Sequence, residues 1–216
     1  MKSHERLAFL RLLQIADSAV PVGAASHSFG LETLVDDGLL TVPSLPELIT
    51  TLLQESALVE AVFCIDSHRH GVSGWRHRMA EMNARRPARE GREGSIAIGR
   101  RLLRLARHLD PSIAELPDPH YSCAFGYVAG VMGIDEGATV LAFLHQAVAG
   151  WISACQRLLP LGQTQAAHIA WQVKPTIVDT AFRAAQIDPR SAPSFTPLLE
   201  LASMQHPHLG TRLFIS

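Results

Sequence analysis

The stretch EGATVLAFLHQAVAGWISACQRLL, residues 136–159, decides the fold class of this chain. Its apolar side chains occupy most faces of a helix, a pattern typical of a helix that other helices surround. Residues 138–155 approach the length of a membrane span, but His145 and Gln146 stand in their middle and Arg157 follows closely. A spanning helix needs about 20 predominantly apolar residues. We therefore predict a buried central helix and no membrane association.

The flanking sequence also has helical periodicity. Before the central segment it predicts a first helix that ends near residue 16 and further helices over residues 28–38, 44–65, 75–85, 88–109 and 121–132. After it we expect a helix over 163–185, kinked at Pro175, and a short helix over 198–204. Ser44 and Glu47 form a capping box at the start of the helix over 44–65.

Three of these helices carry patterned faces. One face of the first helix bears Leu7, Leu10 and Leu13. The helix over 88–109 is expected to turn inward Ile98, Leu102, Leu105 and Leu109. Small residues that permit a close helix crossing recur at Gly126, Gly130 and Gly133. Since no strand-like alternation, internal repeat or composition shift interrupts the pattern, we predict an all-α fold, a single-domain helical bundle of about eight to ten helices over residues 1–216.

Composition narrows the class of protein. The chain has 216 residues, 47% of them hydrophobic, and a net charge of −1, which fits one domain with a substantial core and excludes disorder over most of the chain. The near-zero net charge argues against a nucleic-acid binder. The cysteines, Cys64, Cys123 and Cys155, form no Cys-x-x-Cys pair, and residues 1–11 do not resemble a signal peptide. We expect a cytoplasmic protein.

The sequence contains no recognisable catalytic motif. A nucleotide-binding G-x-x-x-x-G-K-[ST] loop, a G-x-S-x-G turn and an H-E-x-x-H helix are all absent. His68 and His70 stand two residues apart, so a helix would place them on different faces. His206 and His208 leave a weak transition-metal contact open as a minor alternative. We predict a protein that is not an enzyme and that holds no cofactor and no metal site.

Arginines concentrate between residues 76 and 107. Ten arginines stand there against Glu81, Glu90 and Glu93, a local excess of seven positive charges. Two interpretations stay open: a solvated helical face, or a docking face for an acidic protein partner. Nucleic acid is disfavoured because no aromatic residue follows Trp75 within the block to stack on bases.

Three segments resemble signatures of one known family, the urease accessory protein UreF. The first comprises LLQIADSAVPVG at residues 12–23 and SHSFGLE at 26–32, and the second is RLLPLGQT at 157–164. The third is the terminus, with Ala202-Ser203-Met204, His206, Arg212-Leu213-Phe214 and Ser216. Departures from the family pattern occur at Ala25, Gln165, Pro207, Gly210 and Ile215.

The resemblance implies an all-α, dimer-forming adaptor without catalysis. Such a protein bridges UreD (also called UreH) and the nickel-carrying GTPase UreG, and the assembly delivers nickel to apo-urease. A C-terminal partner-binding tail is expected at about 204–216. The partner-binding residues carried over are Pro21, Gly23, Ser26, His27, Ser28, Gly30, Leu31, Glu32, Arg157, Pro160, Leu161, Gly162, Gln163, Arg212, Leu213 and Phe214.

Alternatives to this function and to these roles remain. The chain could regulate UreG by supplying an arginine in trans, from Arg212 or from the arginine block. It could instead bind nickel directly through His206 and His208. The glycine- and proline-containing loops could simply let helices pack, and the apolar tail could dock on its own core.

Overall fold

The computed structural model describes residues 3–193 and 197–215, and over these its regular secondary structure is entirely helical. The α-helices in chain order are α1 (Ser3–Ile15), α2 (Leu31–Asp36), α3 (Leu45–Gln54), α4 (Ser56–His70), α5 (Trp75–Ala84), α6 (Arg89–Leu109), α7 (Tyr121–Val131), α8 (Glu136–Leu158), α9 (Gln163–Gln172), α10 (Lys174–Gln186) and α11 (Pro197–Gln205). Short 3-10 turns occupy Ala24–Ser26, Pro189–Ser191 and His206–His208. The predicted all-α bundle is confirmed, with ten helices if α3 and α4, which meet at Glu55, are counted as one bent helix.

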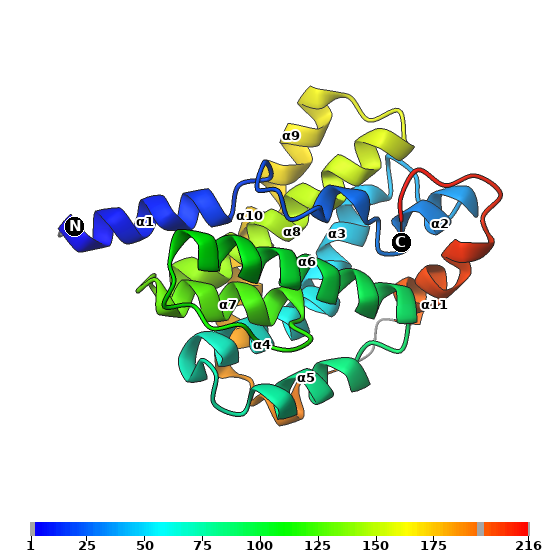
Figure 1. The fold of residues 1–216 in the computed structure, drawn as a ribbon. Helices are drawn as coiled ribbons and strands as arrows, with labels where there is room; N and C mark the ends of the chain where they lie inside the picture. Colours follow the sequence, from blue (N-terminus) through cyan, green and yellow to red (C-terminus); the bar gives the residue numbers. More distant parts are fainter. Residues whose placement is uncertain (1–2, 194–196, 216) are drawn as a thin grey trace.

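Helix α4 lies at the centre of the bundle and packs most closely against α7 (Figure 1). This closeness depends on Gly126, where a Cβ atom would overlap the carbonyl oxygen of Cys64, and on Gly130, where it would lie 2.8 Å from the carbonyl oxygen of His68. The predicted glycine crossing is therefore correct at these two positions. Gly133 takes no part, because it occupies the turn after α7 with φ +70° and nothing within 4 Å of a Cβ.

The predicted helix over 44–65 is present as the bent helix over residues 45–70, but it differs from the prediction in two details. It is broken at Glu55, whose φ of −114° and ψ of −90° separate α3 from α4. The capping box does not form either. Ser44 already has helical φ and ψ, and its hydroxyl donates to the carbonyl oxygen of Thr41 (3.2 Å) and accepts from the amide of Thr41 (3.0 Å). The hydroxyl therefore serves the preceding turn instead of the first turn of α3.

Two further predictions need correction. The segment 163–185 is two helices that meet at Val173, and Pro175 lies in the first turn of α10, where its missing N–H disturbs no helical hydrogen bond. On α6, Ile98 and Leu102 are buried as expected, but Leu109 is 47% exposed because the helix ends there and the chain turns away.

Two apolar segments are long enough to cross a membrane by composition alone, residues 45–70 and Glu136–Leu158. Of the most apolar window in each, 61% and 44% respectively is buried inside this fold. On α8, the side chains of Phe143, Leu144, Val148 and Ile152 enter the core. The prediction that this segment is the central helix, buried on most faces, is wrong, because α8 is buried on one side only and α4 occupies the centre.

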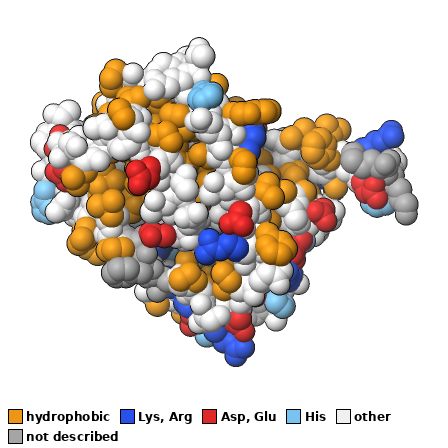
Figure 2. Space-filling model, turned by 180° about the vertical axis from the view of Figure 1, so that it is seen from behind, with side chains coloured by type: hydrophobic (Ala, Val, Ile, Leu, Met, Phe, Trp, Pro, Cys, Tyr) orange, Lys and Arg blue, Asp and Glu red, His pale blue; other side chains and the backbone are white. Residues whose placement is uncertain are grey.

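Helix α1 projects from one end of the body (Figures 1 and 2). Only Leu12 and Ile15 of this helix are buried, near its carboxyl end. The residues predicted to share a face are exposed: Leu7 by 51%, Leu10 by 61% and Leu13 by 52%. The first helix therefore presents apolar side chains outward.

Candidate functional site

Parts of the three sequence signatures meet at one end of the molecule. The carboxyl-terminal segment, residues 206–215, runs beside α2 and the loop before it (Figure 1). The main-chain amide of Ile215 donates to the carbonyl oxygen of Ser26 (2.8 Å). We call the residues that hold this segment, Ser26, Glu32, Arg157, His206 and Phe214, the tail cluster. Ser216 lies outside the described residues.

Glu32 is the main acceptor of the tail cluster. It lies in the first turn of α2 and is only 5% exposed. Its Oε1 accepts the amide of Leu213 (2.6 Å), and its Oε2 accepts the amide of Phe214 (3.2 Å) and Nε2 of His206 (2.8 Å). A buried carboxylate needs this many donors to offset the loss of water. The side chain of Glu32 therefore holds the tail by binding main-chain amides of the tail.

His206 fits this arrangement in one tautomer. To donate to Glu32, Nε2 must carry a hydrogen. The ring is fully buried, and Nδ1 has no hydrogen-bond partner among the described residues. The ring nitrogen that faces Glu32 is thus unavailable to a metal ion while the tail is docked.

Arg157 closes the tail cluster from α8. Its guanidinium donates to the carbonyl oxygens of Ala25 (2.9 Å) and Leu213 (3.3 Å) and stacks on the ring of Phe214, with 4.1 Å between the guanidinium carbon and the ring centroid. Phe214 itself is 5% exposed. Arg157 binds Ala25 only at the main-chain carbonyl oxygen of Ala25. The departure from the family pattern at position 25 therefore leaves this contact intact.

The loop before α2 needs its glycines. Gly23 (φ +74°) and Gly30 (φ +94°) have left-handed backbones, where a Cβ is strained. A Cβ on Gly23 would overlap the guanidinium of Arg101, and one on Gly30 would lie 2.9 Å from the carbonyl oxygen of Leu199. At Gly30 the main chain of α11 and the left-handed backbone both require glycine, whereas at Gly23 the left-handed backbone alone does, because the Arg101 side chain can shift.

His27 and Ser28 lie in the same loop. The ring of His27 stacks on Phe29 with 5.5 Å between centroids. Burial, with a smaller contribution from Arg101, lowers the pKa of His27, so the ring is neutral near pH 7. Ser28 is buried, and its hydroxyl accepts the amide of Glu32 at 3.4 Å. Leu31 is buried at the start of α2.

Other predicted site residues remain outside the tail cluster. Pro21 is exposed, as are Pro160, Gly162 and Gln163 at the turn from α8 to α9. Leu161 is 6% exposed and anchors that turn in the core. Among the described residues, none of these side chains has a hydrogen bond to the tail.

The docked tail still presents an outward surface. Arg212 is exposed, Leu213 is 56% exposed and Ile215 is 66% exposed. The tail therefore combines both alternatives considered above: Phe214 docks on the chain itself, while a cation and two apolar side chains face outward.

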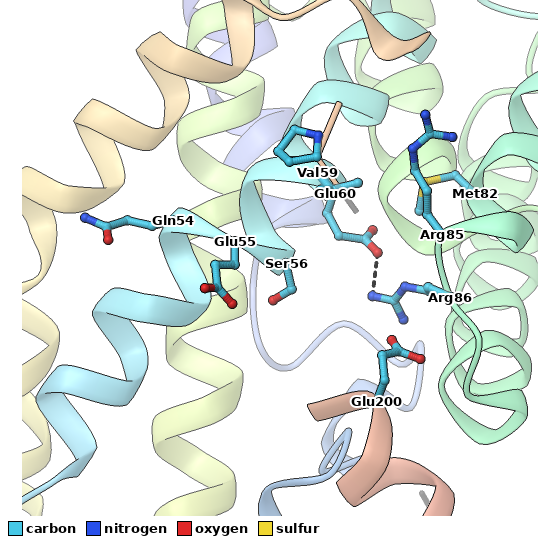
Figure 3. Close-up of a pocket in the computed structure, with 10 residues that line it drawn as sticks. Gln54, Glu55, Ser56, Val59, Glu60, Met82, Arg85, Arg86 and Glu200 are labelled. Carbon is cyan, nitrogen blue, oxygen red and sulfur yellow. Dashed lines mark ion pairs between the residues drawn. The ribbon is translucent and has the colours of Figure 1, made fainter. Parts of the chain in front are cut away.

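Near the tail, α11 is held to the start of α6 beside a hollow of about 250 Å³ (Figure 3). Glu200 of α11 accepts the main-chain amide of Ala88 (2.6 Å), and across the hollow Arg86 pairs with the largely buried Glu60. Thr33 also donates to the carbonyl oxygen of Ala202 (2.9 Å). These bonds connect the tail, α2 and α6 into one unit.

The arginine block does not form one continuous basic face. Six of its ten arginines form ion pairs, four of them with acids from outside the block: Arg78 with Asp66, Arg86 with Glu60, Arg100 with Asp118 and Arg107 with Glu115. The remaining two pairs, Arg85 with Glu81 and Arg89 with Glu93, are internal to it. Tertiary structure thus neutralises much of the charge that the sequence concentrates.

Reactive groups are buried or scattered. The three cysteines are free, and burial raises the pKa of Cys123 and of Cys155 to about 12, so both thiols are protonated near neutral pH. Within residues 3–193 and 197–215, no three His, Cys, Asp or Glu side chains are placed to hold a metal ion.

Sequence reasoning missed the contacts of the tail cluster. It named Glu32 and Arg157 without their partners, and it did not single out Arg101 or the carbonyl groups of Ala25 and Ser26. No sequence signal identifies these partners, because any residue type supplies a carbonyl group and the segments are far apart in the chain.

Comparison with known proteins gives one consistent family. A family model described as UreF matches residues 41–174. A urease accessory protein UreF from Trichormus variabilis is 33% identical over 219 residues, covering 96% of each chain. Proteins of the same name from Bradyrhizobium diazoefficiens (32% identical, covering all of this chain and 95% of the relative) and Microcystis aeruginosa (33% identical, 96% and 97%) are similar.

Proposed function

We propose that this chain, which belongs to the urease accessory protein UreF family, is a non-enzymatic cytoplasmic adaptor. Membership of this family supports a role in urease maturation. In this proposal it bridges UreD (UreH) and the GTPase UreG while nickel is delivered to apo-urease. Nickel is the cargo of the assembly, and the chain itself supplies binding surfaces.

The tail cluster is the observation that carries this proposal. Residues from three signature segments that are separate in the chain support a single outward surface that contains Arg212, Leu213 and Ile215. Arginine and large apolar side chains are enriched where binding energy concentrates. Docking of Phe214 by Glu32 and Arg157 holds this surface in place, which lowers the entropy lost on binding a partner.

Size-exclusion chromatography with light scattering tests the adaptor. The full chain is mixed with its UreD and UreG counterparts and compared with a version that ends before Arg212. We expect a ternary complex with the full chain and none with the truncated chain. Arg190→Ala serves as a matched control, since Arg190 is an exposed arginine that pairs locally with Asp188. Failure of the full chain to bind either partner would overturn the proposal.

A second candidate, regulation of the GTPase by an arginine supplied in trans, is favoured by Arg212. It is exposed and has no ion pair among the described residues. If Arg212 enters the GTPase site, Arg212→Ala and Arg212→Lys both remove the effect on GTP turnover while the complex persists. If Arg212 serves docking alone, the same substitutions weaken the complex and reduce the effect on GTP turnover together. Direct nickel binding is less favoured, because His206 is buried against Glu32.

A homodimer is the third element of the proposal, supported by helix α1. Leu7, Phe9, Leu10 and Leu13 expose about half or more of their side chains on this projecting helix (Figure 2). Exposed apolar patches of this kind mark interaction sites. We expect Leu10→Asp to convert the dimer to a monomer in light scattering, while Leu39→Asp, at an equally exposed leucine after α2, leaves it unchanged. A monomeric native chain would refute this element.

A further inference from the structure

A groove lies on the carboxyl-terminal half of α6, at the opposite end of that helix from α11 and the tail cluster (Figure 1). One wall is an exposed stripe of α6 with Arg100, Arg104 and Arg107. The other wall is the loop between α6 and α7, with Glu115, Leu116, Pro117 and Asp118. The groove encloses about 490 Å³, and the buried Leu103 lies at its floor.

The loop wall is held rigidly. The indole of Trp75 donates to the carbonyl oxygen of Pro117 (2.9 Å), and the amide of Ala114 donates to the hydroxyl of Tyr127 (2.8 Å). A Cβ on Gly99 would overlap the carbonyl oxygen of Pro119, so the loop lies directly on α6 beside Arg100. The groove is therefore preformed, which reduces the entropy that a ligand must lose on binding.

The acidic side chains of the loop form only weak ion pairs with the arginines. Arg100 pairs with Asp118 and Arg107 with Glu115, but all four side chains are between 44% and 82% exposed. Exposed pairs of this kind contribute little and are screened by salt. Arg104, between them on the helix, has no ion pair among the described residues. Carboxylates from another molecule can bind Arg104 and displace the two loop acids.

We propose that this groove, which we call the arginine groove, binds an acidic segment of a protein partner in extended conformation. Arg100 and Arg104 stand about 6 Å apart along α6, from a rise of about 1.5 Å per residue. Alternate side chains of an extended chain are spaced about 6.6 Å apart and face the same way. Carboxylates at alternate positions therefore match the guanidinium groups, and the side chains between them face the opposite way, toward the loop wall with the half-buried Leu116. Arginine also binds carboxylates bidentately.

The experiment measures fluorescence anisotropy of a labelled peptide in which Glu alternates with Leu, titrated with the full chain. We expect Arg104→Glu to weaken binding about tenfold or more, a difference of about 1.4 kcal/mol. The matched control is Arg89→Glu at the other end of α6, also exposed and also an arginine, which we expect to change binding less than about twofold. Circular dichroism confirms that each variant is folded.

A second variant tests the proposal with the opposite sign. Glu115→Gln with Asp118→Asn frees Arg107 and Arg100, so we expect tighter peptide binding. Asn suits position 118 because its φ is +45°, a left-handed conformation that Asn tolerates. Equal weakening by Arg104→Glu and Arg89→Glu would mean attraction to net charge alone and would overturn the arginine groove. Absence of peptide binding would overturn it too, as would tighter binding of polyuridylate with the same dependence on Arg104, which would indicate a nucleic-acid site.

Discussion

Replacing Glu32 by Gln should release the carboxyl-terminal tail while leaving the bundle folded. The carboxylate accepts three hydrogen bonds, from the amides of Leu213 (2.6 Å) and Phe214 (3.2 Å) and from His206 (2.8 Å). Glutamine has nearly the same shape but only one acceptor oxygen, so at least one of these donors faces an NH₂ group instead. A buried donor without an acceptor costs about 1–3 kcal/mol. We take about 2 kcal/mol as the change in the free energy of tail opening.

Amide hydrogen exchange measures this opening directly. A change of about 2 kcal/mol corresponds to roughly a thirtyfold faster exchange of the amides of Leu213 and Phe214. The amide of Val62, in the central helix α4, should exchange at its native rate. Glu47→Gln is the matched control, because Glu47 also lies in the first turn of a helix but is exposed. Unchanged exchange at 213 and 214, or equal acceleration at 62, would refute the reasoning that Glu32 holds the tail locally.

Three further predictions concern packing, pH and the tail. Gly126→Ala should lower the free energy of unfolding in urea by about 3 kcal/mol, because its Cβ would overlap a carbonyl of α4, whereas Gly150→Ala, with open space around it, should not. Burial lowers the pKa of His120 to about 4, so the unfolded chain binds more protons than the folded chain between pH 6.5 and 4. The free energy of unfolding should therefore fall as the pH falls through this range, by about 1.5 kcal/mol between pH 6.5 and 5, and a flat profile would contradict this. Arg157→Lys should loosen the tail by about 1 kcal/mol, seen as faster trypsin cleavage after Arg212, since an ammonium cannot both stack on Phe214 and bind two carbonyls.

The adaptor proposal and the arginine groove make separate demands on the molecule. The first depends on the tail cluster, where Glu32 and Arg157 dock residues 206–215. The second depends on Arg104 and its neighbours on α6, whose side chains take no part in the tail cluster. Variants at one site should therefore leave the other unaffected. The two proposed surfaces lie at opposite ends of α6 (Figure 1).

The sequence by itself determined the all-α class, the extent of most helices and the family. Helical periodicity is a local property, so α5, α6, α7 and α8 begin and end within a residue of their predicted positions. The signatures named most of the residues that hold the tail. Local pattern failed where a competing local bond intervened, as at Ser44, or where a helix broke without a proline or glycine signal, as at Glu55. At Val173 the signal was present in Pro175, but it marks the start of a new helix and not a kink within one.

Only the tertiary structure decided how these residues act. Whether Phe214 faces a partner or its own chain depends on Glu32 and Arg157, which lie more than fifty residues away. The arginine block loses its continuity because Glu60, Asp66, Glu115 and Asp118 reach it from other elements. Burial and charge pairing are sums over neighbours in space, and the order of residues along a chain does not specify those neighbours until the helices pack.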